Sequence, residues 1–217
     1  MVRIEKFQPL IAEFIGTMML SLAVLTTARM FSVGTAPWYI SITAGAALFL
    51  IVTKLGHVSG AHVNPAVTVG QWSLKKIDTI QAAFYIVFQL FGGATALLLF
   101  NFLTDTQLPT ATSDMFLWRA FFGEALGGAV FGAGIIAAIS KKLDDKYTAV
   151  TIGFSLTAGA MLASLSSAGY LNPAVALANN GVSKITMIAP IVGVTFGMQL
   201  YTYLFAPQSR STTRRKK

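Results

Sequence analysis

Two copies of the triplet Asn-Pro-Ala stand out in an otherwise apolar chain. Asn is favoured at the N-cap of a helix, and Pro suits the first helical position because its missing N–H has no intrahelical partner there. Each triplet opens a short apolar stretch, 65–74 or 173–179, whereas a spanning helix needs roughly 20 apolar residues. Two half-helices are therefore expected to meet near the middle of a pore. The central constriction is expected to be formed by Asn64, Pro65, Ala66, Asn172, Pro173 and Ala174.

Half-helices that enter from opposite faces would bring two helix N-termini together near the bilayer centre. Each N-terminus carries roughly half a positive charge, so cations, including hydronium, would be repelled. If the side-chain oxygens of Asn64 and Asn172 cap their own helices, the NH₂ groups are expected to be free to donate to a neutral solute. This chemistry is that of a filter for small uncharged polar molecules.

The composition indicates a helical membrane protein. Of 217 residues, 54% are hydrophobic and 11% are charged, while a soluble domain carries about 25% charged residues. No cysteine is present, which excludes disulfides and thiolate metal sites. We predict an all-α protein with six transmembrane helices, at 8–31, 37–55, 79–103, 116–140, 147–166 and 184–206.

Similar markers recur in the same order at an offset of about 110 residues. Glu13, Asn64 and Gln89 are matched by Glu124, Asn172 and Gln199, and the Thr-Ala-Gly-Ala sequence at 43–46 recurs at 157–160. Three spans per copy is an odd number, so the second copy must be inserted upside down. We therefore predict an inverted tandem repeat of two units, 1–107 and 108–206, followed by a basic cytoplasmic tail, 207–217.

The basic residues are distributed unequally between the two sides of these spans, and Lys and Arg near span ends remain on the cytoplasmic side. The net charge of +8 is therefore interpreted as a topology signal in an integral membrane protein, and no nucleic-acid partner is expected. With both termini cytoplasmic, the outer segments hold Arg29, Arg119 and Lys184. The inner segments hold Arg3, Lys6, Lys54, Lys75, Lys76, Lys141, Lys142, Lys146, Arg210, Arg214, Arg215, Lys216 and Lys217.

The segments that lead into the triplets, 56–63 and 166–171, contain Gly and Ser and are predicted to be non-helical. Irregular backbone is tolerated at membrane depth where it lines an aqueous cavity. Its carbonyl groups are expected to form a ladder of acceptors along the pore, from Gly60, Ala61, His62, Val63, Ala168, Gly169 and Tyr170.

Two kinds of ionisable residue allow alternative roles. Glu13 and Glu124 could couple transport to protons, but their symmetric positions favour supporting the irregular loop of each repeat. His57 and His62 could form a metal site or a pH gate. Hydrogen bonding within the first loop is the preferred interpretation, because the chain has no other His.

The segment 59–68, Ser-Gly-Ala-His-Val-Asn-Pro-Ala-Val-Thr, closely resembles the first signature of the aquaporin, or major intrinsic protein, family. The segment 169–174 resembles the second signature, and 12–17 resembles the first helix of that family. The resemblance implies six tilted spans and two re-entrant half-helices, one pore per subunit, a homotetramer among membrane lipids, and loop support by the two Glu residues.

The family usually has Arg after the second triplet, where this chain has Val175. Family spacing places the other selectivity-filter positions at Ala44, Ala160 and Gly169. Because these four residues are small and uncharged, we expect an unusually wide, apolar filter that is less selective for water. Glycerol, urea, ammonia or hydrogen peroxide could then pass as well as water.

A passive channel that excludes protons and ions is therefore the leading interpretation. A secondary transporter with inverted repeats is one alternative, and a structural membrane protein with a vestigial pore is another. No enzyme activity, cofactor or metal is expected, since the sequence has no nucleophile–base arrangement, metal cluster or phosphate loop.

Overall fold

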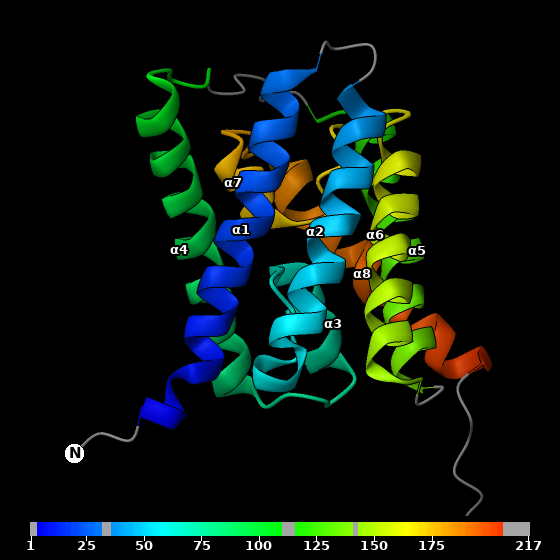
Figure 1. Ribbon diagram of the computed structural model, residues 1–217. Coiled ribbons are helices and arrows are strands. Elements are labelled where there is room, and N and C mark those ends of the chain that lie inside the picture. Colours follow the sequence, from blue (N-terminus) through cyan, green and yellow to red (C-terminus); the bar gives the residue numbers. More distant parts are fainter. Residues whose placement is uncertain (1–3, 32–35, 110–115, 141–142, 206–217) are drawn as a thin grey trace, which may run out of the picture.

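A computed structural model describes residues 4–31, 36–109, 116–140 and 143–205. In these residues a short 3-10 helix, Ile4–Lys6, precedes α1 (Gln8–Met30), α2 (Ala36–Ser59), α3 (Pro65–Ser73), α4 (Thr79–Thr104), α5 (Trp118–Ser140), α6 (Asp145–Ala163), α7 (Pro173–Ala178) and α8 (Lys184–Phe205). Figure 1 shows the six long helices standing around α3 and α7. The predicted all-α architecture is confirmed, while the basic tail, 207–217, lies outside the described residues.

Five of the long helices, α1, α2, α4, α5 and α8, are long and apolar enough to cross a membrane. The remaining one, α6, has 19 residues and carries Asp145 and Lys146 in its first turn. At 1.5 Å per residue it is about 28 Å long, close to the thickness of the hydrocarbon core. It packs along α2 and α5, so it stands as the sixth member of the bundle.

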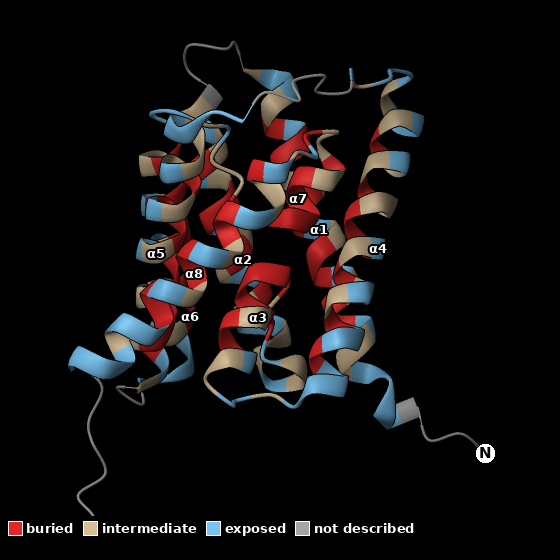
Figure 2. Ribbon diagram, turned by 180° about the vertical axis from the view of Figure 1, so that it is seen from behind, coloured by how far each residue is buried: buried red, intermediate tan, exposed pale blue. Residues whose placement is uncertain are grey.

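The outer surface of the bundle is apolar and its interior holds the buried polar side chains. Phe91, Phe102 and Phe154 are 62%, 82% and 72% exposed, whereas Glu13 and Glu124 are fully buried. Figure 2 shows buried residues along the inward faces of the helices and around α3 and α7. This distribution suits a protein whose surroundings are lipid and whose polar groups face the bundle interior.

The two short helices occupy opposite halves of the bundle. Figure 1 shows α3 in the lower half and α7 in the upper half. Their observed bounds, Pro65–Ser73 and Pro173–Ala178, differ by one residue from the predicted 65–74 and 173–179.

The second helix is longer than predicted, because it continues to Ser59 instead of ending at 55. Residues 56–59, predicted to be non-helical, form its last turn, and the N–H of Gly60 still bonds to the carbonyl of Gly56 at 2.9 Å. The helix ends at Gly60, whose φ of 86° is a left-handed conformation that Gly adopts without steric cost. Gly56 is simply a helical glycine.

Close helix contacts depend on residues without a side chain. A Cβ atom on Gly93 of α4 would lie 2.3 Å from the carbonyl oxygen of Ala174 in α7, and one on Gly132 of α5 would lie 2.3 Å from that of Val194 in α8. Small residues allow such approaches between helices in membranes, where no hydrophobic force draws them together. Gly93 therefore lets α4 support the second half-helix directly.

Replacement of Gly93 by Ala is expected to lower the thermal stability of the detergent-solubilised protein, because overpacking costs about 1–3 kcal/mol. Gly56→Ala is the matched control: its Cβ would find nothing nearer than the Val52 side chain at 3.7 Å. That variant should be as stable as wild type or more so, by about 0.5–1 kcal/mol. Equal melting temperatures for Gly93→Ala and wild type would show that the α4–α7 contact can relax.

Candidate functional site

Each half-helix is capped by the Asn of its triplet. The Oδ1 atom of Asn64 accepts a hydrogen bond from the N–H of Ala66 at 2.8 Å, and that of Asn172 accepts from Ala174 at 2.9 Å. Both Asn residues have extended backbone conformations, and a Pro follows at the first helical position. The local sequence thus accounts for where α3 and α7 begin.

The two caps are joined to each other across the repeats. The Nδ2 of Asn64 donates to the carbonyl oxygen of Leu171 at 2.9 Å, and the Nδ2 of Asn172 donates to that of Val63 at 2.9 Å. The expectation that both NH₂ groups are free is therefore wrong, since one hydrogen of each is used within the protein. Because an amide nitrogen carries two hydrogens, one donor per Asn remains for a solute.

The residues that precede the two Asn residues have strained backbones. Val63 has a φ of 42° and Leu171 a φ of 51°, in a region that a β-branched or bulky residue rarely enters. Such a conformation costs on the order of 1–3 kcal/mol and persists where neighbouring groups fix it. Here the carbonyl is held by the Asn of the other repeat, and the N–H is held by a buried carboxylate.

These carboxylates belong to Glu13 of α1 and Glu124 of α5. Oε2 of Glu13 accepts from the N–H of Val63 at 2.6 Å, and Oε1 accepts from that of His62 at 3.0 Å. In the second repeat, Oε2 of Glu124 accepts from Leu171 at 2.8 Å and Oε1 from Tyr170 at 3.0 Å. The geometry at both sites is that of loop support.

The support is stronger in the first repeat. Glu13 also accepts from the Ser59 hydroxyl at 2.6 Å and from Nε2 of Gln89 at 2.7 Å. Ser167, in the second loop, instead donates to the carbonyl of Ala163 at 2.8 Å. Gln199, the sequence marker paired with Gln89, is exposed and donates to Ser73 at 3.2 Å. The two Gln residues therefore have different roles.

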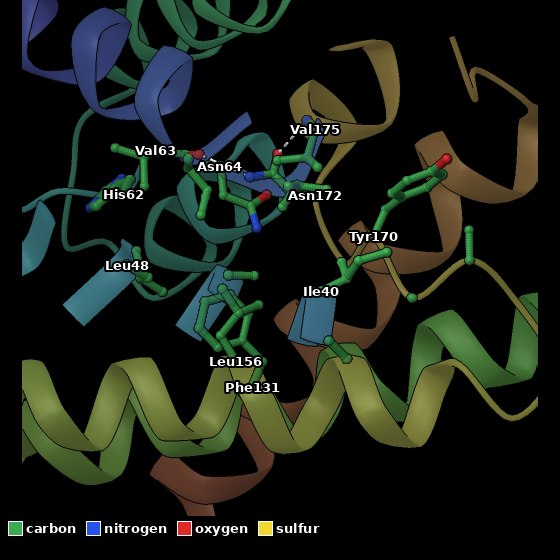
Figure 3. Close-up of a pocket in the computed structure, with 16 residues that line it drawn as sticks. Ile40, Leu48, His62, Val63, Asn64, Phe131, Leu156, Tyr170, Asn172 and Val175 are labelled. Atoms are coloured by element: carbon green, nitrogen blue, oxygen red, sulfur yellow. Dashed lines mark hydrogen bonds between the residues drawn. The ribbon is translucent and has the colours of Figure 1, made fainter. Parts of the chain in front are cut away.

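A cavity runs beside the two Asn residues. Figure 3 shows Asn64 and Asn172 next to each other, with Leu156 and Phe131 across from them. All four predicted filter residues border this cavity: Ala44, Ala160, Gly169 and Val175. His62, Val63, Ala168 and Tyr170 of the predicted carbonyl ladder also border it, whereas Gly60 and Ala61 do not.

The cavity is tight and mostly apolar. The centre of a water molecule can occupy only about 20 Å³ of it, and a single water needs at least about 10–15 Å³. Sequence reasoning missed six apolar lining residues, Leu20, Val24, Ile40, Leu48, Phe131 and Leu156. Three of these could have been predicted from helical periodicity, because residues four apart lie on the same face of a helix. Ile40 and Leu48 are four residues before and after Ala44, and Leu156 is four residues before Ala160.

A family model described as Major intrinsic protein matches the sequence of this chain over residues 1–201. This chain belongs to the major intrinsic protein family. Members of this family are channels and not enzymes, so the chain is a membrane channel for water and small solutes.

Individual major intrinsic proteins are similar to this one over most of its length. Aquaporin-2 of Rattus norvegicus is 30% identical over 94% of this chain and 81% of its own. Aquaporin AqpM of Methanothermobacter thermautotrophicus is 29% identical over 89% of this chain and 96% of its own. The X-ray structure of the aquaglyceroporin from Plasmodium falciparum superposes with a TM-score of 0.72, at 21% identity, over 92% of this chain and 97% of that one.

In this major intrinsic protein the two His residues lie in different surroundings. His57 is exposed on α2, so its predicted place within the loop is wrong, a consequence of the longer helix. His62 borders the cavity, with Nδ1 3.2 Å from the Thr68 hydroxyl and its ring edge-on to Tyr85. Within the described residues, no group of three or more His, Cys, Asp or Glu side chains could hold a metal.

Proposed function

We propose that water and small neutral solutes cross this channel in single file, past Asn64 and Asn172, while protons and ions are excluded. The observation that carries this proposal is the meeting of two capped half-helices beside one cavity. Each helix N-terminus contributes a partial positive charge. The free amide hydrogen of each Asn can bind a lone pair, so a neutral solute gains contacts that a cation lacks.

We propose Ala44, Ala160, Gly169 and Val175 as the selectivity filter. None of these side chains carries a charge, a donor or an acceptor, so the filter is apolar and lacks a fixed cation. By themselves the four residues also leave more room than aromatic side chains and an Arg would. Considered alone, without the other residues that line the cavity, these four residues would admit water, ammonia, hydrogen peroxide, urea and glycerol.

The charge distribution supports an orientation. Lys6, Lys75 and Lys146 lie at the end of the bundle where α1 begins, while Arg29 and Arg119 lie at the opposite end. By the positive-inside rule we propose that the first end is cytoplasmic. Assembly as a homotetramer stays a prediction from the family resemblance.

Reconstitution in liposomes tests the proposed function. We expect light scattering after a sucrose step to report water flow well above that of empty liposomes, with a low activation energy and no dependence on a proton or sodium gradient. Saturable solute flux that requires such a gradient would instead support a secondary transporter. Water flow equal to that of empty liposomes would support a structural protein with a vestigial pore.

A further inference from the structure

The tightness of the cavity has a source outside the four proposed filter positions. Their side chains are small, yet the centre of a water molecule can occupy only about 20 Å³ of the space beside them. Ile40 of α2 borders the same cavity. It lies one helical turn before Ala44, which places it on the same face and about 6 Å further toward the end of the bundle where α2 begins.

Ile40 points into the bundle and away from lipid. Its sequence neighbours Trp38 and Tyr39 are 64% and 46% exposed, whereas Ile40 is partly buried and packs against the main core cluster. In Figure 3 it lies beside Tyr170, at the end of the cavity away from His62. Its side chain therefore stands at the outer mouth of the pore.

The chemistry of this mouth disfavours solutes with many polar groups. Ile is β-branched, so its side chain is held in few rotamers and cannot easily swing aside. Ile40, Ala44 and Val175 all border this cavity, and their side chains cannot replace the hydrogen bonds that a solute loses on entry. Each polar group stripped of water without a new partner adds to the barrier, so the barrier grows with the number of hydroxyl or amide groups.

We propose that Ile40 sets the size and polarity limit of this channel. It fills room that the four small filter residues leave, so that water, ammonia and hydrogen peroxide pass while glycerol and urea are held back. This inference rests on the proposed function and names the class of solute that the same pore selects.

The test compares Ile40→Ala with wild type in liposomes, measuring water, glycerol and urea permeability. Ile42→Ala is the matched control, because Ile42 is 52% exposed on the same helix and does not border the pore cavity. Ile40→Ala is expected to raise glycerol and urea permeability about tenfold or more, as deletion of pocket methylenes can do, with water permeability changed less than about twofold. Ile42→Ala should match wild type for all three.

The possible outcomes separate the two claims. Unchanged glycerol and urea permeability in Ile40→Ala, with wild-type water flow preserved, would overturn the role of Ile40 alone. High glycerol permeability in wild type would overturn it as well. Wild-type water flow no faster than in empty liposomes would overturn the proposed function and this inference together. Intact water flow in Ile40→Ala also shows that the variant is folded.

Discussion

Glu13→Ala is expected to abolish water permeability and to destabilise the protein strongly. The change removes the acceptor for four donors: the Ser59 hydroxyl, the N–H groups of His62 and Val63, and Nε2 of Gln89. The bonds from Val63 and Gln89 are buried, and each buried donor left without a partner costs about 1–3 kcal/mol, so the loss is on the order of 2–6 kcal/mol. Stopped-flow scattering and the melting temperature measure the two effects.

Two further variants are compared with Glu13→Ala: one should lose less stability, and the other is a control. Glu124→Ala removes the acceptor for the N–H groups of Tyr170 and Leu171, so about half the loss of stability is expected. Glu5→Ala, at an exposed position in the 3-10 helix Ile4–Lys6, should leave both properties unchanged. Wild-type permeability and stability in Glu13→Ala would contradict a supporting role for this carboxylate.

Asn64→Asp is expected to let protons through. Asp caps a helix about as well as Asn, so α3 should still begin at the same residue. However, the variant loses the donor to the Leu171 carbonyl and places a negative charge where the N-terminus of α3 supplies a partial positive one. In a protein interior, the attraction between a proton and a nearby full negative charge exceeds about 1.4 kcal/mol. Because a change of about 1.4 kcal/mol in the barrier changes the rate about tenfold, proton flux should rise at least about tenfold.

Asn172→Asp should act in the same way, since Asn172 has the same cap and the matching cross-repeat bond. Asn101→Asp provides the control, because Asn101 lies in the last turn of α4 and does not border the cavity. A proton flux in the two cap variants no higher than in Asn101→Asp would show that the caps do not carry the electrostatic barrier.

The features encoded by local chemistry could be predicted from the sequence. Asn followed by Pro predicted both half-helix starts, and a membrane-buried carboxylate in each repeat predicted a loop contact. The end of α2 could not be predicted in this way, because Gly56 and Gly60 look alike in sequence. Only the positive φ of Gly60 distinguishes the residue that ends the helix from the one that continues it.

Contacts between segments far apart in the chain also could not be predicted from the sequence. The Asn64–Leu171 and Asn172–Val63 bonds join the two repeats, and no local pattern predicts them. The Thr-Ala-Gly-Ala sequences at 43–46 and 157–160 have the same limit: Gly45 packs on Gly153 of α6, while Gly159 packs on Gly127 of α5. Identical tetrapeptides therefore serve different contacts, and pattern matching alone cannot align them in space.

Proton flux measured during osmotic water flow tests the central claim most directly. Wild-type protein would be reconstituted in liposomes that contain a pH-sensitive dye, and a pH step would be applied together with a sucrose step. The account predicts fast shrinkage with an internal pH that changes no faster than in empty liposomes. A pH change that accompanies the water flow would contradict it, because the paired half-helix ends would then not separate protons from water.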